Sequence, residues 1–122
     1  MKKILIIDDE PDITEIVSLF AEQLGFAADV SYSGDDAREK FASRKYWVVF
    51  CDLRMPGLSG LEIFAMFSQL DPEVKRRFVL ITGALIDSDT EAIVRKKRIT
   101  IFTKPFNFDA FQKILLSFEG NA

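Results

Sequence analysis

Short apolar segments alternate along the chain with stretches in which apolar residues recur every three or four positions. The segments that predict strands are Ile4 to Ile7, Ala27 to Tyr32, Trp47 to Cys51, Phe78 to Ile81 and Ile99 to Phe102. The first, third and fourth are apolar without alternation, which is typical of parallel strands covered by helices on both faces. The second carries the polar residues Asp29 and Ser31, so we expect it at an edge of the sheet.

A helical pattern follows each apolar segment. The first helix is predicted to begin at Pro11, which suits a first turn, and to end at Gly25. Between them the apolar residues keep a helical period: Ile13, Ile16, Val17, Phe20 and Leu24. Capping-box spacings predict that two later helices begin at Ser59 and Ser88, with Glu three positions on in each case. Ser33 and Asn107 are suited to cap the remaining two helices, the last of which runs through Phe118.

The order of elements is strand then helix, five times over. This order predicts a doubly wound α/β domain with a five-stranded parallel sheet. No linker, repeat or low-complexity segment interrupts the pattern, so we expect a single domain over residues 1–122 and no second one.

Composition narrows the class of protein. A chain of 122 residues with 48% hydrophobic content is long enough for one core and argues against disorder. The net charge is −3, and we interpret the basic run Arg95 to Arg98 as a solvated helix end that complements the helix dipole, without direct contact to nucleic acid.

The single Cys51 excludes an internal disulfide and lies inside an apolar strand, where a buried inert thiol is expected. We find no signal peptide or membrane-length span, and a cytoplasmic location is expected.

Polar residues follow four of the five predicted strands. Asp8 and Asp9 come directly after the first strand, Asp52 after the third, Thr82 after the fourth and Lys104 after the fifth. In a doubly wound sheet the carboxyl ends of the strands share one edge, and ligands bind there. We therefore expect these five side chains to line one site.

The three carboxylates of this set require a positive partner. At a separation of about 5 Å each pair repels by about 3 kcal/mol at an effective dielectric near 20, so the cluster must protonate, hydrate or bind a metal. Hard oxygen ligands favour Mg²⁺ over zinc. We therefore predict a Mg²⁺ site at Asp8, Asp9 and Asp52, with the ammonium group of Lys104 facing the cluster.

Four segments of the sequence resemble the signature segments of the response-regulator receiver domain of two-component signalling. They are Asp8-Asp9-Glu10-Pro11, the stretch from Asp52 to Gly60, Leu80-Ile81-Thr82-Gly83 and Lys104-Pro105-Phe106. The intervals between them also match, and the resemblance covers essentially the whole chain. It implies the flavodoxin-like arrangement with strand order 2-1-3-4-5.

The resemblance also implies a function and roles for individual residues. Asp52 would accept a phosphoryl group from the phosphohistidine of a sensor histidine kinase or a histidine phosphotransfer protein. Asp9, Asp52 and the main-chain carbonyl of Arg54 would coordinate Mg²⁺ directly, whereas Asp8 would act mainly through a metal-bound water. Thr82 and Lys104 would hold the phosphoryl oxygens.

Further implications concern the output of the domain. The bond between Lys104 and Pro105 would be cis, a conformation that few residue pairs other than X-Pro adopt. Inward movement of Thr82 would change the face formed by the fourth helix, the fifth strand and the fifth helix, and so alter binding of a downstream protein partner. Such a protein is a phosphoacceptor switch and not an enzyme with an external substrate.

The chain departs from the family pattern at a position that matters for switching. The family usually carries Tyr or Phe three positions before the lysine, and here that position is Ile101. Phe102 is adjacent, but neighbouring strand residues point to opposite faces, so we expect it to pack in the core and not to substitute. Arg98 occupies a turn in which the family favours small residues.

The sequence also bears on three alternative classes of protein. A haloacid-dehalogenase-type phosphatase would need Asp-x-Asp-x-Thr after the first strand, whereas this chain has Asp8-Asp9-Glu10. A flavodoxin-like binder would need a phosphate or flavin loop in place of the acidic edge. A receiver that acts only as an interaction module is the more serious alternative, and the presence of Asp52, Thr82 and Lys104 argues against it.

Overall fold

The computed structural model describes residues 2–83, 86–104 and 106–119. Its strands are β1 (Lys3–Ile7), β2 (Ala27–Ser31), β3 (Val48–Asp52), β4 (Phe78–Thr82) and β5 (Thr100–Thr103). All neighbouring pairs are parallel and the order is β2-β1-β3-β4-β5. The five strands, the doubly wound α/β class and the strand order predicted above are confirmed, and β2 is an edge strand as expected.

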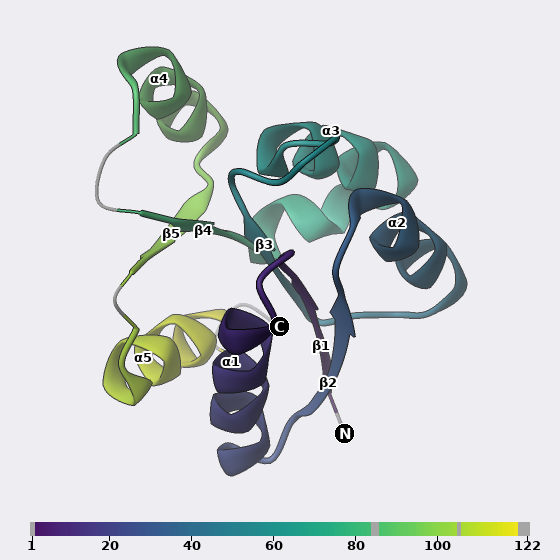
Figure 1. Ribbon diagram of the computed structural model, residues 1–122, viewed down its shortest axis with the longest axis vertical. Coiled ribbons are helices and arrows are strands. Elements are labelled where there is room, and N and C mark those ends of the chain that lie inside the picture. The colour runs from purple at the N-terminus through teal and green to yellow at the C-terminus, as the bar shows by residue number, and fades with distance from the viewer. Residues whose placement is uncertain (1, 84–85, 105, 120–122) are drawn as a thin grey trace.

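Helices cover both faces of this sheet (Figure 1). They are α1 (Pro11–Gln23), α2 (Gly34–Ser43), α3 (Gly60–Leu70), α4 (Ser88–Lys97) and α5 (Phe108–Glu119), with a 3₁₀ helix η1 (Pro72–Arg77) after α3. Figure 1 shows α1 and α5 on one face, and α2, α3 and α4 on the other. A central strand therefore needs apolar residues at nearly every position, which explains why β1, β3 and β4 lack alternation.

The core consists of two apolar clusters separated by the sheet. Ile4 and Ile6 pack with residues of α1 and α5, whereas Leu5 and Ile7 pack with residues of α2 and α3. Phe102 is buried in the first cluster, and the half-buried Ile101 packs against the second. The prediction that these two neighbours point to opposite faces, with Phe102 in the core, is confirmed.

The five helices begin within one residue of their predicted starts, but one predicted cap is wrong. Pro11 is at the first turn of α1, Ser59 forms the complete capping box of α3, and the side chains of Ser33 and Asn107 cap α2 and α5. The prediction that Ser88 caps α4 is wrong. The carboxylate of Asp87, one residue earlier, accepts the Thr90 N–H at 2.7 Å, because a charged acceptor there also complements the helix dipole.

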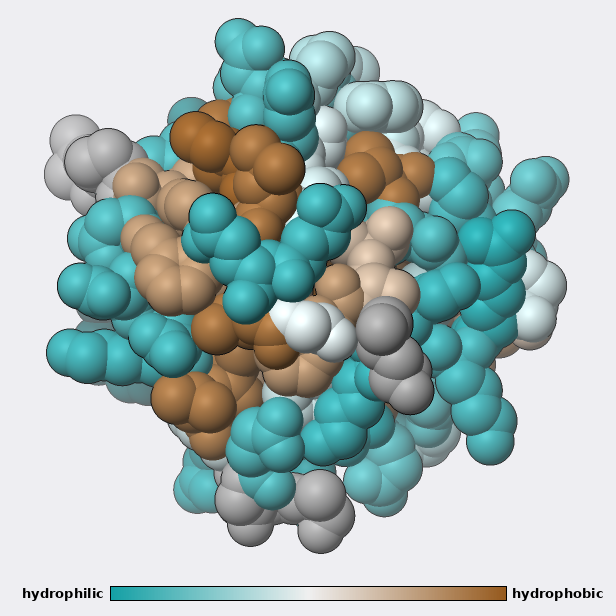
Figure 2. All heavy atoms as spheres, turned by 90° about the horizontal axis from the view of Figure 1, so that it is seen from below, coloured by the Kyte–Doolittle hydropathy of each residue, from teal (hydrophilic) through white to brown (hydrophobic). Residues whose placement is uncertain are grey.

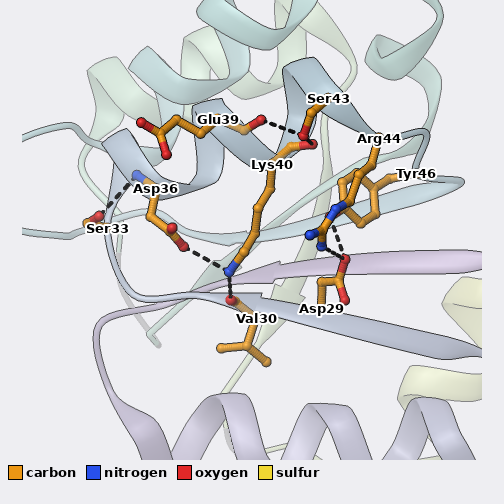
Figure 3. A network of polar contacts seen from close by, with 9 residues as sticks. All are labelled: Asp29, Val30, Ser33, Asp36, Glu39, Lys40, Ser43, Arg44 and Tyr46. Atoms are coloured by element: carbon orange, nitrogen blue, oxygen red, sulfur yellow. Dashed lines mark hydrogen bonds and ion pairs between the residues drawn. The ribbon is translucent and has the colours of Figure 1, made fainter.

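Side chains from α2 and the following loop cover the outer edge of β2 (Figure 3). The ammonium group of Lys40 donates to the Val30 carbonyl and to Asp36, while Arg44 and Tyr46 both donate to Asp29. These contacts occupy an edge that would otherwise be open to pairing with another chain.

Gly60 fixes the path of the chain after Asp52. Its N–H donates to the Leu53 carbonyl at 2.9 Å, and a Cβ at this position would lie 2.6 Å from the Asp52 carbonyl oxygen and 2.7 Å from Leu80 Cδ2. Only glycine fits this close approach of α3 to β3. The first turn of α3 is thereby held against the strand end that carries Asp52.

Arg98 provides a test of backbone strain in this fold. It ends α4 in the left-handed region with φ 56°, where the following N–H of Ile99 donates to Val94 at 3.0 Å. Because this conformation favours glycine, Arg98→Gly should raise the free energy of unfolding by about 0.5–1 kcal/mol. Urea denaturation of both proteins measures the difference.

Lys96→Gly is the matched control, because it removes a cation from the same turn at a helical position. It should lower the free energy of unfolding by about 1 kcal/mol. Equal losses in the two variants would show that the conformation of Arg98 carries no strain.

Candidate functional site

The carboxyl edge of the sheet brings together the polar residues that follow the strands. Backbone hydrogen bonds that continue the sheet fix the strand ends there: the Asp8 N–H donates to the Ser31 carbonyl, the Leu53 N–H to the Ile81 carbonyl and the Lys104 N–H to the Thr82 carbonyl. The site residues are therefore placed by the strand order itself. Because β1 lies beside β3, and β4 and β5 follow, the acids and the lysine all lie at the same edge of the sheet.

Asp8, Asp9 and Asp52 form a compact acidic cluster. Each offers a carboxylate oxygen, and these oxygens all lie within 4.8 Å of one another. Asp8 and Asp52 are buried, whereas Asp9 is exposed to solvent. The predicted convergence of the three carboxylates is thus confirmed.

Burial makes this cluster costly when it is charged. Burial raises the pKa of Asp8 from 3.8 to about 6, against the effect of the Glu10 N–H that donates to Oδ1 at 2.9 Å, and the charge of Asp52 adds to the rise. Burial likewise raises the pKa of Asp52, although the Arg54 N–H and Lys104 act in the opposite direction. Both carboxylates therefore lack sufficient positive charge around them.

The donor set fits a hard divalent cation. Asp8 Oδ2 is buried without a hydrogen-bond partner among the described residues, so this oxygen remains available to a ligand. The cluster offers oxygen ligands alone, with no imidazole or thiolate, as Mg²⁺ prefers.

A cavity of about 200 Å³ opens beside the cluster. Its lining includes Asp52, Thr82, Lys104, Arg54 and Glu10. Thr82 is buried at the end of β4, and Lys104 keeps about a quarter of its side chain exposed (28%). A larger hollow of about 620 Å³ lies near the amino ends of β3 and β4 and contains none of these groups.

Most of the predicted site residues meet here, and one lies outside the described residues. The structure places Asp8, Asp9, Asp52, Thr82 and Lys104 around one site. Ile101 lies on β5 away from the cavity lining. Pro105, predicted to follow a cis peptide bond, is not among the residues that the structure describes.

Glu10 is the site residue to which the sequence analysis gave no role. It lines the cavity, and its Oε2 lies 4.0 Å from Lys104 Nζ. Its place directly after Asp8 and Asp9 was a signal that could have drawn attention to it.

Comparisons with known proteins agree with this geometry. The family model of the response regulator receiver domain matches residues 4–116. The chain belongs to this family of two-component signalling, whose members are signalling switches.

Similar proteins include curated regulators and solved structures. Over 108 residues the chain is 33% identical to the nitrogen assimilation regulatory protein NtrX of Azorhizobium caulinodans, covering 87% of this chain and 23% of that protein. It is 30% identical over 106 residues to the response regulator GtcR of Aneurinibacillus migulanus, covering 87% of this chain and 43% of that protein. The chain thus spans less than half the length of these relatives.

Two solved structures show the same fold over nearly the full chain. The response regulator TrrA of Thermotoga maritima, solved in complex with Mg²⁺ and BeF, has a TM-score of 0.82 and 30% identity, and 97% of this chain and 99% of that chain are covered. The chemotaxis protein CheY4 of Vibrio cholerae has a TM-score of 0.84 and 22% identity, with 96% and 98% covered. None of the described helices has the length and apolar character needed to cross a bilayer.

Because burial raises the pKa of Asp8, we predict that the ionised side chain of Asp8 lowers the stability of the fold as the pH rises. Its pKa is about 6 in the folded chain against 3.8 without the fold, so the folded state binds the proton more tightly. The cost of the charge is present in full above pH 6 and disappears as the pH falls towards 4. Without Mg²⁺, Asp8→Asn should therefore raise the free energy of unfolding at pH 7.5 by about 1–3 kcal/mol.

Urea denaturation in the presence of a chelator, repeated from pH 7.5 to 4.5, measures this effect. The difference between the variant and the original chain should shrink as the pH falls. Asp9→Asn, at the exposed neighbour, serves as the control and should change stability by less than half as much. A pH-independent difference for Asp8→Asn would contradict the account of the cluster.

Proposed function

We propose that this chain is a phosphorylation-dependent switch that accepts a phosphoryl group on Asp52 from a phosphohistidine, with Mg²⁺ as cofactor. The donor would be a sensor histidine kinase or a histidine phosphotransfer protein. The observation that carries the proposal is the juxtaposition of Asp52, Thr82 and Lys104 around one cavity beside an acidic cluster. A carboxylate acceptor with a cation and a hydroxyl beside it is what phosphoryl transfer needs.

Asp52 supplies the nucleophile. One carboxylate oxygen attacks the phosphorus, the new P–O bond forms as the P–N bond of phosphohistidine breaks, and the imidazole leaves with a proton from solvent. Because the transition state is loose, the protein's task is to align the two groups and to stabilise charge on the equatorial oxygens. The Lys104 ammonium and the Thr82 hydroxyl, which line the same cavity as Asp52, would do so.

Asp9, Asp52 and the main-chain carbonyl of Arg54 would hold Mg²⁺, with Asp8 assisting through a bound water. When bound, this ion offsets negative charge of the carboxylates and of the incoming phosphoryl group. Asp8 Oδ2, for which the described part of the chain offers no hydrogen-bond partner, supports a cation here. So does TrrA, the similar protein that was solved with Mg²⁺ and BeF.

Helix α4 is the element best suited to respond to phosphorylation. Of its ten residues only Val94 is buried, whereas α3 buries five of eleven. A helix that buries so little moves at low cost. Thr82 and Lys104 frame the segment that contains α4 and β5, so their movement towards phosphorylated Asp52 would displace the α4-β5-α5 face and alter binding of a downstream protein. Ile101 replaces the usual aromatic residue of that face, so we expect the displacement of α4 to carry the signal.

A protein donor also needs a surface on which to dock. Figure 2 shows apolar side chains gathered on the face formed by α1 and α5. The exposed ones are Ile16 and Leu19 of α1 and Leu116 of α5. Because α1 begins two residues after Asp9, this face adjoins the site. Its apolar character supports docking of a protein and not of nucleic acid, and the cytoplasm, where such a donor meets its acceptor, is the expected location.

Replacement of the acceptor tests the proposed function directly. Asp52→Asn keeps the shape of the side chain and removes the nucleophilic oxygen, so labelling by acetyl phosphate and Mg²⁺ should fall below one-hundredth of the original level. Intact-mass spectrometry detects the phosphoryl group. Asp12→Asn, an exposed acid of the first turn of α1, should leave labelling within twofold. Labelling of Asp52→Asn at the original level would overturn the assignment.

A further inference from the structure

The lysine of the site is turned towards a residue that the phosphoryl chemistry does not use. Among the residues that the structure describes, Glu10 alone has a carboxylate oxygen within 4.0 Å of Lys104 Nζ. Asp52 lines the same cavity and forms no ion pair with Lys104 at that distance. In the unphosphorylated chain the Lys104 ammonium group thus pairs with Glu10 and not with the acceptor Asp52.

Helix capping does not explain the presence of Glu10. It occupies the N-cap position of α1, where Ser, Thr, Asp and Asn are preferred, and its side chain makes no capping hydrogen bond. The backbone of Glu10 is nevertheless fixed. Its N–H donates to Asp8 Oδ1 at 2.9 Å, and Pro11 restricts it to the extended conformation observed. A fixed backbone therefore holds at the cavity lining a carboxylate that no capping hydrogen bond uses and that lies near Lys104.

We propose that Glu10 is a positioning residue that holds Lys104 in the unphosphorylated chain and releases it when Asp52 is phosphorylated. This inference rests on the proposed function. The phosphoryl group, with roughly two negative charges, competes for the ammonium group and wins it from a single carboxylate. Glu10 thus sets how readily the phosphorylated arrangement forms.

The exposure of the pair suits an exchange of partners. Glu10 keeps 60% of its side chain exposed and Lys104 keeps 28%. A pair so open to water is weak and easily broken, whereas a buried pair would hold the lysine permanently. The charge of Glu10 also reaches Asp52, since it opposes the effect that Lys104 has on the pKa of that acid. Loss of Glu10 should therefore favour the phosphoryl-bound form by about two- to fivefold.

Three variants separate a specific ion pair from a general effect of charge. Glu10→Gln removes the charge and keeps the length. Glu10→Asp keeps the charge and withdraws the carboxylate by about 1.5 Å, out of reach of Lys104. Asp12→Asn removes one charge from the same helix end at a residue outside the cavity lining.

The affinity for beryllofluoride, a mimic of the phosphoryl group on Asp52, is the first measurement. It is made at Mg²⁺ concentrations that saturate each variant, because loss of an acid weakens Mg²⁺ binding. Glu10→Gln and Glu10→Asp should both bind beryllofluoride two to five times more tightly than the original chain, and Asp12→Asn should stay within 1.5-fold.

The NMR signals of the Lys104 side chain are the second measurement. Both Glu10 variants should shift the Lys104 Hε and Cε signals in the free chain and leave them unchanged in the beryllofluoride-bound chain, where the lysine has already left Glu10. A purely structural role of Glu10 would move the signals in both forms or in neither.

The outcomes distinguish this inference from the proposed function. If Glu10→Asp behaves like the original chain while Glu10→Gln binds more tightly, a general charge effect replaces the ion pair and the inference fails. If all variants bind beryllofluoride like the original chain, the inference fails while the proposed function stands. If the original chain neither binds beryllofluoride nor accepts a phosphoryl group, the proposed function itself fails.

Discussion

Crowded negative charge at the carboxyl edge of the sheet is the constraint on which the rest of the domain depends. Two buried carboxylates, Asp8 and Asp52, lie within 4.8 Å of each other and of Asp9, and the pKa values of both buried acids are raised. The described lysine nearest to them is turned towards Glu10. The folded chain therefore favours any arrangement that brings further positive charge to this edge.

The acidic cluster keeps its position because the sheet that carries it is tightly packed. The rings of Phe50 of β3, Phe102 of β5 and Phe111 of α5 pack against one another, and the missing side chain of Gly60 lets α3 lie close against the end of β3. By contrast, α4 buries a single side chain. On the proposed function, a change of charge at Asp52 is therefore relieved by movement of the loosely packed α4 and not by the core.

The parts of this structure that follow from local pattern could be predicted from the sequence. Apolar periodicity located all five strands, and the position of acids at strand ends led to the acidic cluster, because parallel strands end at one edge. Choices between neighbouring residues could not be predicted. Asp87 and Ser88 are both good helix caps, and Asp8 and Asp9 are chemically alike, yet the path of the backbone buries one acid and exposes the other. The pairing of Glu10 with Lys104 depends on where β5 ends in the folded sheet. It could not be predicted from the sequence around Glu10.

The decisive measurement compares the amide chemical shifts of the chain without ligand, with Mg²⁺ alone, with beryllofluoride alone, and with both. We expect Mg²⁺ alone to shift signals near Asp8, Asp9 and Asp52, beryllofluoride alone to have no effect, and the two together to shift signals throughout α4 and β5. Changes confined to residues around the cavity, with α4 and β5 silent, would contradict the claim that relief of charge at this edge moves the rest of the domain.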